Sequence, residues 1–297
     1  MTDGLNLAGW SAPRLANVEA ALDRWVLAQA PAGLGEAMRY AVLDGGKRLR
    51  PLLVLAAAEA VGADAPAALR AACAIELIHA YSLVHDDLPC MDNDVLRRGK
   101  PTVHVRYGQA QALLAGDALQ ALAFELLTPP AHEMPVQVQA ALCGLLARAA
   151  GYAGMAGGQA IDLASVGRHL DETALRQRHR LKTGALLQAS AMMGAACGEP
   201  GARACEALAR YGDALGLAFQ VVDDILDVTA DSATLGKTAG KDAAQDKPTY
   251  VSILGLERAR AYAATLLEEA LDALASSGLA DTQALRALAH TVIRRDN

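Results

Sequence analysis

Apolar side chains recur along this chain with the period of an α-helix. One series runs through Leu208, Tyr211, Leu215, Phe219, Val222 and Leu226, and a shorter one through Leu15, Val18, Leu22 and Trp25. Spacings of three and four residues place each series on one face of a helix, where it packs against a core. No segment alternates with a period of two for long enough to predict a sheet, and no repeat of fixed period is present. The sequence therefore predicts an all-α fold.

The composition favours closely packed helices in one domain. Hydrophobic residues make up 53% of the 297 residues, but Phe, Trp and Tyr together only 4%, and Ala and Leu dominate nearly every stretch. Such side chains favour helices over strands. Because no linker-like stretch divides the chain, we expect a single helical domain over residues 1–297.

Charge and hydropathy exclude several classes of function. The longest uncharged run, Thr183 to Gly198, falls short of the ~20 apolar residues of a membrane span. Met1 to Ser11 has no basic region followed by an apolar core, so we expect no signal peptide and a cytoplasmic location. The net charge of −6 argues against nucleic acid as a partner, and a solvated face or a nucleic-acid strip is the alternative for the basic run from Arg176 to Lys182. Five cysteines without a C-x-x-C pair are expected to be small buried side chains rather than zinc ligands or disulfides.

The stretch from Thr229 to Thr249 differs from its surroundings. It is polar, contains Gly236, Gly240 and Pro248, and lies between two helical patterns. It also carries three lysines, Lys237, Lys241 and Lys247. Long loops in a compact domain are usually functional or disordered, and we expect a mobile lid over residues 229–249.

The first acidic cluster is HDDLPCMDND, residues 85–94. Asp86 and Asp92 would lie ~240° apart on a continuous helix. Pro89 disfavours such a helix, so the chain can turn and bring Asp92 back towards Asp86. Asp87 belongs to the same cluster. Taken alone, a cluster of this kind can be a solvated acidic patch or a helix cap.

The second cluster, DDILD at residues 223–227, needs no turn. Gln220, Asp223 and Asp227 follow the spacing i, i+3, i+7, so they share one helix face. Both clusters stand among apolar residues, where bare carboxylates are costly to bury. Hard oxygen ligands without Cys or His partners suit Mg²⁺, which bridges carboxylates to substrate phosphates. The two clusters together predict magnesium and a diphosphate.

Basic residues supply the rest of an anion site. GGKRLRP at residues 45–51 is a turn that opens a helix, so backbone N–H groups coincide with Lys47, Arg48 and Arg50. Arg97 and Arg98 follow the first acidic cluster directly. An exposed basic turn at a helix start is the alternative for residues 45–51.

Six segments in order closely resemble the trans-isoprenyl diphosphate synthases, and bacterial farnesyl diphosphate synthases best. They are GGKRLRP (45–51), IELIHAYSLVHDDLPCMDNDVLRRGKPT (75–102), KTGAL (182–186), FQVVDDILD (219–227), LGKTAGKD (235–242) and KPTY (247–250). The resemblance covers nearly the whole chain. It implies an antiparallel helix bundle around a central cavity, usually as a homodimer, and head-to-tail prenyl transfer between two small diphosphates.

The resemblance also implies a role for each matching residue. Mg²⁺, as three ions, would be bound by Asp86, Asp92 and Asp223 with the support of Asp87 and Asp227. The allylic diphosphate would be held by Arg97, Lys182, Thr183, Gln220, Lys237 and Lys247. Isopentenyl diphosphate would be held by Lys47, Arg50, His79 and Arg98, with Arg48 nearby. Asp86, Asp92, Asp223, Lys182 and Arg97 would be the catalytic set.

Tyr81 and Ser82 are the expected determinants of product length. Tyr81 lies five residues before Asp86. At this position it resembles the aromatic residue that forms the floor of the cavity in farnesyl synthases. Farnesyl diphosphate is therefore the expected product, and geranyl or geranylgeranyl diphosphate is the alternative. A side chain that merely packs between helices is the other interpretation of Tyr81.

Two departures from the family pattern are Cys90, where alanine is common, and Asn93, where an acidic residue is frequent. Neither removes an expected metal ligand. A terpene cyclase is a rival hypothesis, but a second aspartate cluster replaces the usual N-D-x-x-S-x-x-x-E motif. A non-catalytic regulatory subunit is another, although all expected aspartates and lysines are present. Gly158-Gln159 and Asp162 also resemble the family pattern and are given only a supporting role, and Arg294 and Arg295 receive no assigned role.

Overall fold

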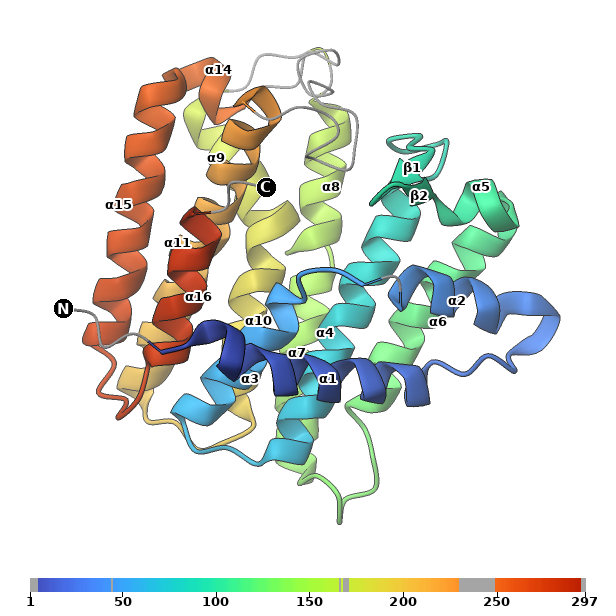
Figure 1. The fold of residues 1–297 in the computed structure, drawn as a ribbon, viewed down its shortest axis with the longest axis horizontal. Coiled ribbons are helices and arrows are strands. Elements are labelled where there is room, and N and C mark those ends of the chain that lie inside the picture. The colour runs from blue at the N-terminus through green and yellow to red at the C-terminus, as the bar shows by residue number, and fades with distance from the viewer. Residues whose placement is uncertain (1–4, 44, 166, 168–170, 230–248, 295–297) are drawn as a thin grey trace.

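The computed structural model describes residues 5–43, 45–165, 167, 171–229 and 249–294. The predicted lid, with Lys237, Lys241 and Lys247, falls almost entirely on residues 230–248 and so lies outside the described residues. Arg295 lies outside them as well. Figure 1 shows the arrangement of the described helices.

Helices account for nearly all of the regular structure that is described. The first half contains α1 (Leu7–Trp25), the short 3₁₀ turn η1 (Pro31–Gly33), α2 (Leu34–Val42), α3 (Leu49–Ala60), α4 (Ala65–Asp86), strands β1 (Leu96–Arg97) and β2 (Lys100–Pro101), α5 (Val103–Tyr107) and α6 (Gln109–Leu126). The second half contains α7 (Val136–Ala150), α8 (Met155–Ala164), α9 (Glu172–His179), the π-turn η2 (Arg180–Gly184), α10 (Ala185–Ala196), α11 (Ala202–Thr229), α14 (Tyr250–Leu254), α15 (Leu256–Ala275) and α16 (Gln283–Ile293).

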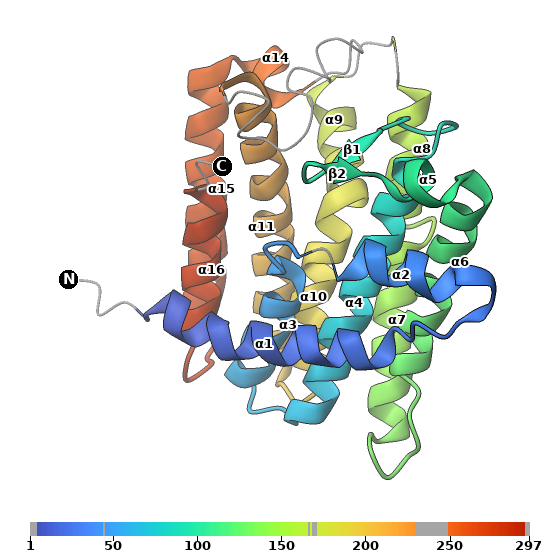
Figure 2. The same cartoon turned by 45° about the vertical axis from the view of Figure 1, so that its right-hand side comes forward.

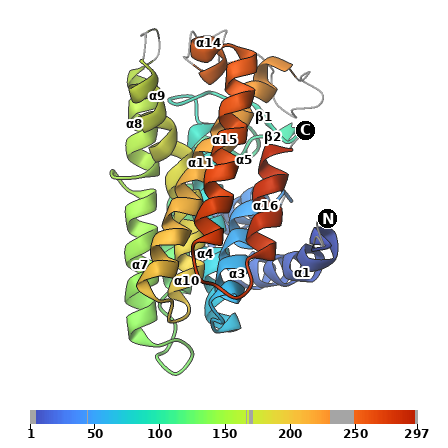
Figure 3. The same ribbon diagram turned by 90° about the vertical axis from the view of Figure 1, so that its left-hand side faces the viewer.

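The long helices form a bundle. α4 packs between α3 and α6, while α10 bridges α3 and α11, and α11 lies along α15. Figures 1 and 2 show α1 crossing the bundle at its lower end, and Figure 3 shows α15 and α16 beside α11. The apolar stripe expected from Leu208 to Leu226 lies on α11, where Leu208, Tyr211 and Leu215 are buried. The predicted all-α fold is confirmed.

α4 packs between α3 and α6, and its sequence explains where it begins. The Asp64 side chain accepts a hydrogen bond from the backbone N–H of Ala67 and so caps the first turn, next to Pro66 at a position where no backbone donor is needed. Within the described part of the chain, α4 alone is long and apolar enough to cross a membrane by length and composition. Its most apolar window is 72% buried inside the protein, as in the core helix of a globular protein.

One hairpin departs from the all-helical pattern. Leu96 pairs with Pro101, and Arg97 pairs with Lys100, through a turn in which Arg98 and Gly99 both have positive φ angles, 52° and 75°. Two left-handed residues form the turn that best matches the twist of a hairpin. Strands of two residues are too short to show a period-two pattern, so the sequence did not indicate them.

The cysteines follow their prediction only in part. All five are free, and Cys73 and Cys197 are buried. Cys90 is exposed, which corrects the expectation that each would be a buried apolar side chain. It follows Pro89 in the turn after α4, where a small polarisable side chain has no core to enter.

Candidate active site

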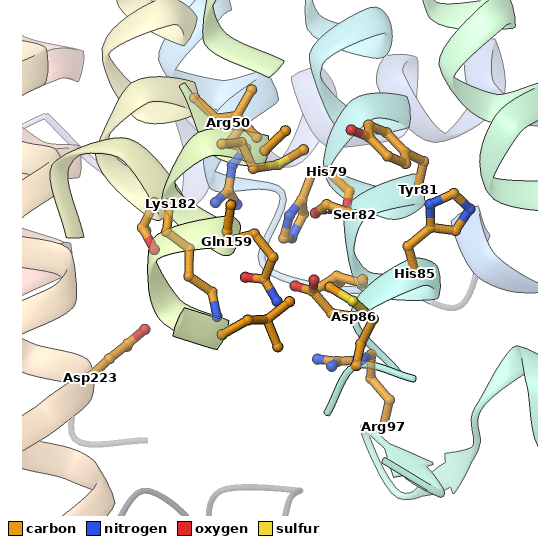
Figure 4. Close-up of a pocket in the computed structure, with 18 of the residues that line it drawn as sticks. Arg50, His79, Tyr81, Ser82, His85, Asp86, Arg97, Gln159, Lys182 and Asp223 are labelled. Carbon is orange, nitrogen blue, oxygen red and sulfur yellow. Dashed lines mark hydrogen bonds between the residues drawn. The ribbon is translucent and has the colours of Figure 1, made fainter. Parts of the chain in front are cut away.

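A cavity of about 570 Å³ lies between α4, α8, α11 and the π-turn η2. Asp86 and Asp223 line it from two different helices, α4 and α11. Arg97 and Lys182 add two cations to its wall. Figure 4 shows these four side chains arranged around the cavity, with Asp223 across from Asp86. The structure therefore gathers both aspartate clusters and two predicted phosphate ligands at one site.

The turn after α4 brings the first acidic cluster together. Asp86 ends the helix, and the chain then folds back so that the backbone N–H of Asp92 donates to the carbonyl of Asp86 over 2.9 Å. Asn93 supports the turn from the left-handed region, with a φ angle of 52°, and its N–H donates to Leu88. The predicted return of Asp92 towards Asp86 after Pro89 is confirmed.

The carboxyl group of Asp86 has a raised pKa, which a bound cation would lower. Burial raises the pKa of Asp86 to about 6, and Asp92 and Asp87 add to the rise, while Lys182 and Arg97 lower it. The burial effect is the largest of these causes. A carboxylate that is costly to ionise in the ligand-free protein gains most when a metal ion compensates its charge.

Asp87 grips Arg97. Its carboxylate is 2% exposed and receives two hydrogen bonds from Arg97 Nε, at 3.1 and 2.9 Å, and one from Nη2, at 2.6 Å. Burial raises the pKa of Asp87, and the hydrogen bonds from Arg97 oppose that rise. The pair fixes the arginine fork, whose guanidinium lines the cavity. The structure thus shows Asp87 as the support of Arg97.

A π-turn presents Lys182 and Thr183. Residues 172–196 are helical without a break, and the middle segment, Arg180–Gly184, has π-helical hydrogen bonding. Such bulges insert a residue into the helix and change the direction of its side chains, often at functional sites. Lys182 Nζ donates to Asp162 Oδ2 over 2.6 Å, and Thr183 Oγ1 donates to Gln220 Oε1 over 3.0 Å. Both Lys182 and Thr183 line the cavity.

The second acidic cluster divides between two roles. Asp223 lines the cavity, whereas Asp227 is 6% exposed and is not part of its wall. Asp224 is also buried, and it accepts hydrogen bonds from Gln220 Nε2 at 3.0 Å and from the backbone N–H of Tyr250 at 2.8 Å. The structure therefore brings Asp223 to the cavity and uses Asp224 to attach α14 to α11.

A second cavity of about 630 Å³ adjoins the first and contains the other basic cluster. Lys47 lines it, and Arg50, His79, Arg98 and Phe219 line both cavities. The shared side chains form the boundary between the two cavities. Two cationic sites thus lie next to each other, which is the arrangement that two diphosphates require.

The turn before α3 is tied to the hairpin. Gly45 and Gly46 have φ angles of 79° and 129°, and the Arg98 guanidinium donates to the Gly45 carbonyl over 2.5 Å. A Cβ on Gly46 would lie 3.0 Å from Arg98 Nη2, so glycine allows this approach. Arg98 is accordingly held against residues 45–46 at the boundary of the cavities.

Arg48 differs from its two basic neighbours. It is 4% exposed and forms ion pairs with Glu76 at 2.7 Å and Glu19 at 2.6 Å, and its Nη2 donates to the Val42 carbonyl. These bonds connect the start of α3 to α1, α2 and α4. The sequence pattern placed three cations at this helix start, but the guanidinium of Arg48 is occupied by the protein itself.

The charged form of His79 is disfavoured by its surroundings. Burial lowers the pKa of His79 well below its ordinary value, and the nearby cations Arg50, Arg98 and Arg97 lower it further. A neutral imidazole can donate one hydrogen bond and accept another, but it adds no charge. We therefore expect His79 to contribute a directed hydrogen bond at the boundary of the two cavities.

Tyr81 and Ser82 lie on the cavity wall one to two turns before Asp86. Tyr81 is 9% exposed, and its ring meets the His85 ring edge-on, with centroids 5.4 Å apart. Ser82 Oγ donates to the His79 carbonyl over 2.8 Å. The hydroxyl of Ser82 is thus satisfied within the helix.

Sequence reasoning gave several residues of the site little or no role. Gln159, Met155 and Phe219 line the first cavity, and Asp162 is 4% exposed and binds Lys182. The signal for Gln159 and Asp162 was their resemblance to the family pattern, which assigned them only a supporting role and gave no direction towards a ligand.

The polyprenyl synthetase family model matches residues 31–288. The chain belongs to the polyprenyl synthetase family. The match spans both aspartate clusters, the π-turn and the basic turn before α3, and the predicted resemblance is confirmed. Members of this family are prenyltransferases, and the chain is identified as one of these enzymes.

Individual relatives of the chain support the same family assignment. The chain is 51% identical over 271 residues to the farnesyl diphosphate synthase of Escherichia coli (strain K12), which covers 88% of this chain and 89% of the relative. It is 48% identical over 286 residues to the chloroplastic heterodimeric geranylgeranyl pyrophosphate synthase large subunit 1 of Arabidopsis thaliana, covering 94% of this chain and 77% of that one. Relatives that make products of different length are therefore about equally similar.

A solved structure agrees along the whole chain. The Helicobacter pylori geranyltransferase complexed with magnesium and isoprenyl diphosphate superposes with a TM-score of 0.84 at 35% identity, covering 99% of this chain and 98% of that one. The polyprenyl synthetase fold is therefore the fold of this chain.

The chemistry of the donors fits Mg²⁺. In the described part of the chain, no three His, Cys, Asp or Glu side chains converge closely enough to hold a metal by themselves. Mg²⁺ usually binds one or two carboxylates and completes its shell with water and phosphate oxygens. Asp86 and Asp223, which face one cavity from two helices, are such carboxylates.

Proposed function

We propose that this prenyltransferase joins an allylic diphosphate, dimethylallyl or geranyl, head to tail with isopentenyl diphosphate, and that farnesyl diphosphate is its main product. The observation that carries the proposal is the pair of adjoining cavities. One contains Asp86, Asp223, Arg97 and Lys182, the other contains Lys47, and both share Arg98.

Asp86, Asp92 and Asp223 would hold the magnesium, as three ions, and Asp227 would support them from the buried side of α11. Bound Mg²⁺ would neutralise the departing diphosphate and so lower the barrier to ionisation of the allylic substrate.

The side chains of the protein act mainly by position and charge. Arg97, fixed by Asp87, and Lys182, fixed by Asp162, bind the allylic diphosphate together with Thr183 and Gln220. Lys237 and Lys247, outside the described residues, are assigned to the same diphosphate. Fixed cations stabilise the charge that develops when the carbon–oxygen bond breaks.

The second substrate is positioned from the adjoining cavity. Lys47, Arg50, His79 and Arg98 bind the diphosphate of isopentenyl diphosphate, so that its double bond lies next to the allylic carbon. The new carbon–carbon bond forms to the allylic cation, and a proton then leaves to the departed diphosphate. The apolar walls exclude water that would convert the cation to an alcohol.

Product analysis tests the proposal. Purified protein is given Mg²⁺ with isopentenyl diphosphate and either dimethylallyl or geranyl diphosphate, and the products are identified by mass spectrometry. A linear fifteen-carbon diphosphate supports the proposal. Cyclic hydrocarbons would instead identify a terpene cyclase, and folded protein without any prenyl product would identify a regulatory subunit.

Geranylgeranyl diphosphate is the second candidate product, because relatives of that activity are nearly as similar as the farnesyl synthases. Tyr81 favours the shorter product, since its ring occupies the cavity wall near Asp86. The same assay separates the two products by mass.

Arg98→Met is expected to raise the KM for isopentenyl diphosphate by about 10–100-fold, because one charge-assisted contact to phosphate is worth roughly 1.5–3 kcal/mol. The KM for geranyl diphosphate should stay within about twofold. Steady-state kinetics with each substrate varied in turn measure both values.

Arg106→Met is the matched control, because Arg106 lies on α5 and its guanidinium stacks over the Tyr40 ring, outside both cavities. It should leave both KM values unchanged. If Arg98→Met weakens only geranyl diphosphate binding, the two diphosphate sites have been exchanged in our assignment.

We also propose that the described helices form one domain and that the protein acts as a homodimer in the cytoplasm. The family match over most of the chain supports the single domain. The homodimer and the location stay predictions from the sequence.

A further inference from the structure

Gln159 presents a buried carboxamide that has no partner in the described part of the chain. Its side chain on α8 is 9% exposed, and neither Oε1 nor Nε2 forms a hydrogen bond to any residue that the structure describes. A buried amide in this state lowers the stability of the folded protein. Such groups are rare, and each calls for a specific explanation such as a catalytic role or a bound ligand.

The amide faces the first cavity. The other α8 side chains on this wall are apolar, namely Met155, Ala156, Ala160 and Leu163. Figure 4 shows the carboxamide of Gln159 pointing into the cavity and, in that view, lying between Lys182 and Asp86. The carboxamide of Gln159 is thus a polar group on the otherwise apolar α8 wall, and it lies near the residues assigned to the allylic diphosphate and its metal.

The position of Gln159 is fixed by its neighbours on α8. At Gly158 the helix meets the π-turn so closely that a Cβ would lie 2.1 Å from the backbone nitrogen of Lys182. One turn further on, Asp162 binds Lys182 Nζ at 2.6 Å and the Arg178 guanidinium at 3.1 Å. These contacts hold the α8 backbone at Gln159 and the ammonium of Lys182 in one rigid unit, as preorganised catalysis requires.

We infer that Gln159 is a catalytic residue, whose carboxamide contacts the allylic diphosphate at the carbon–oxygen bond that breaks. Nε2 donates a hydrogen bond to the departing oxygen, and the partial negative charge of Oε1 faces the carbon that becomes positive. Both contacts strengthen as charge develops, so they stabilise the transition state more than the bound substrate. The inference rests on the proposed function and adds a residue to it.

Gln159→Leu tests the role, because leucine has a similar volume and no polar atom. We expect kcat to fall by about 100-fold, the loss typical of one donor directed at developing charge. The KM for isopentenyl diphosphate should change by less than about twofold. Hydrolysis of geranyl diphosphate to geraniol with inorganic pyrophosphate and Mg²⁺, without isopentenyl diphosphate, should slow by the same factor as kcat. The melting temperature of the ligand-free protein should stay equal or rise.

Gln188→Leu is the matched control. Gln188 lies on α10, outside both cavities, and its Nε2 donates to the Ala209 carbonyl over 3.1 Å. Loss of this bond should lower the melting temperature and leave kcat unchanged. The two variants therefore separate an amide that serves catalysis from one that serves the fold.

Three results would overturn the inference. One is Gln159→Leu with wild-type kcat, a second is a loss of activity that matches a loss of folded protein, and a third is a higher KM for geranyl diphosphate at unchanged kcat. Wild-type protein that forms no prenyl product would overturn the proposed function and the role of Gln159 together. Normal wild-type product with an active Gln159→Leu variant would overturn only the role of Gln159.

Discussion

Asp86→Asn is expected to lower turnover by about 1000-fold and, in the absence of metal, to make the protein more stable. The activity falls because the variant loses a charged ligand to magnesium at the departing diphosphate, an effect of several kcal/mol on the barrier. Single-turnover kinetics at limiting magnesium measure the loss. Asp223→Asn, on the other side of the cavity, should lose activity to a similar extent.

The gain in stability follows from the raised pKa of Asp86, about 6 in the folded protein. Because this is above the ordinary value of about 3.9, the folded state holds the proton more tightly than the unfolded state. The free energy of unfolding of the wild type therefore falls as the pH rises from about 4 to about 6, and this penalty is complete above that range. Asparagine does not titrate, so the variant should be on the order of 3 kcal/mol more stable at neutral pH.

Urea unfolding with a chelator, from about pH 5 to about pH 8, measures this difference. Asp117→Asn is the control, since the Asp117 side chain on α6 is 60% exposed, and it should change neither turnover nor stability noticeably. Near-normal turnover of Asp86→Asn at limiting magnesium would contradict the assignment of Asp86 as a metal ligand.

Tyr81→Ala is expected to change the main product from fifteen carbons to twenty or more. Tyr81 lies five residues, or ~7.5 Å, before Asp86 on α4. The His85 ring contacts it edge-on, and His85 is itself fixed by the Leu113 carbonyl 3.0 Å from Nε2 and by close contact with Gly116 on α6. These contacts fix the position of the tyrosine ring. A closely packed wall cannot admit another five-carbon unit without strain.

Mass spectrometry of the products formed from geranyl and isopentenyl diphosphates measures the shift. Tyr81→Phe keeps the ring and should keep the fifteen-carbon product, while Tyr152→Ala removes a tyrosine that is 92% exposed and should change nothing. Unchanged products from Tyr81→Ala, or a wild type that releases mainly geranyl or geranylgeranyl diphosphate, would refute this role of Tyr81.

Features with a long-range pattern could be predicted from the sequence. The apolar stripe from Leu208 to Leu226 predicted α11, because burial of one helix face demands a regular spacing. The return of Asp92 to Asp86 was predictable because Pro89 has a strong local effect on the backbone. Both predictions depend on forces that act within a few residues or repeat along the chain.

Features that depend on tertiary contacts could not be predicted. The π-turn at Arg180–Gly184 differs from an ordinary helix by one residue of hydrogen-bond register, and its sequence shows no sign of it. The direction of Arg48 depends on Glu19 and Glu76, which are far away in the sequence. The role of Asp87 likewise depends on the path of the hairpin that carries Arg97.

The end of α4 that is assigned to metal binding and the residue assigned to the cavity floor belong to one rigid helix, and this has an evolutionary consequence. Tyr81 and Asp86 are separated by a fixed length of α4, and Leu77 and Ile78, one turn deeper, are fully buried. On the role proposed for Tyr81, a single codon change at position 81 is expected to alter the length of the product without disturbing the chemistry proposed at position 86. Descendants of one ancestral enzyme can diverge in product while the rest of the sequence drifts slowly. Similarity averaged along the chain then reflects ancestry, whereas on this proposal the side chain at one helical position determines the present product.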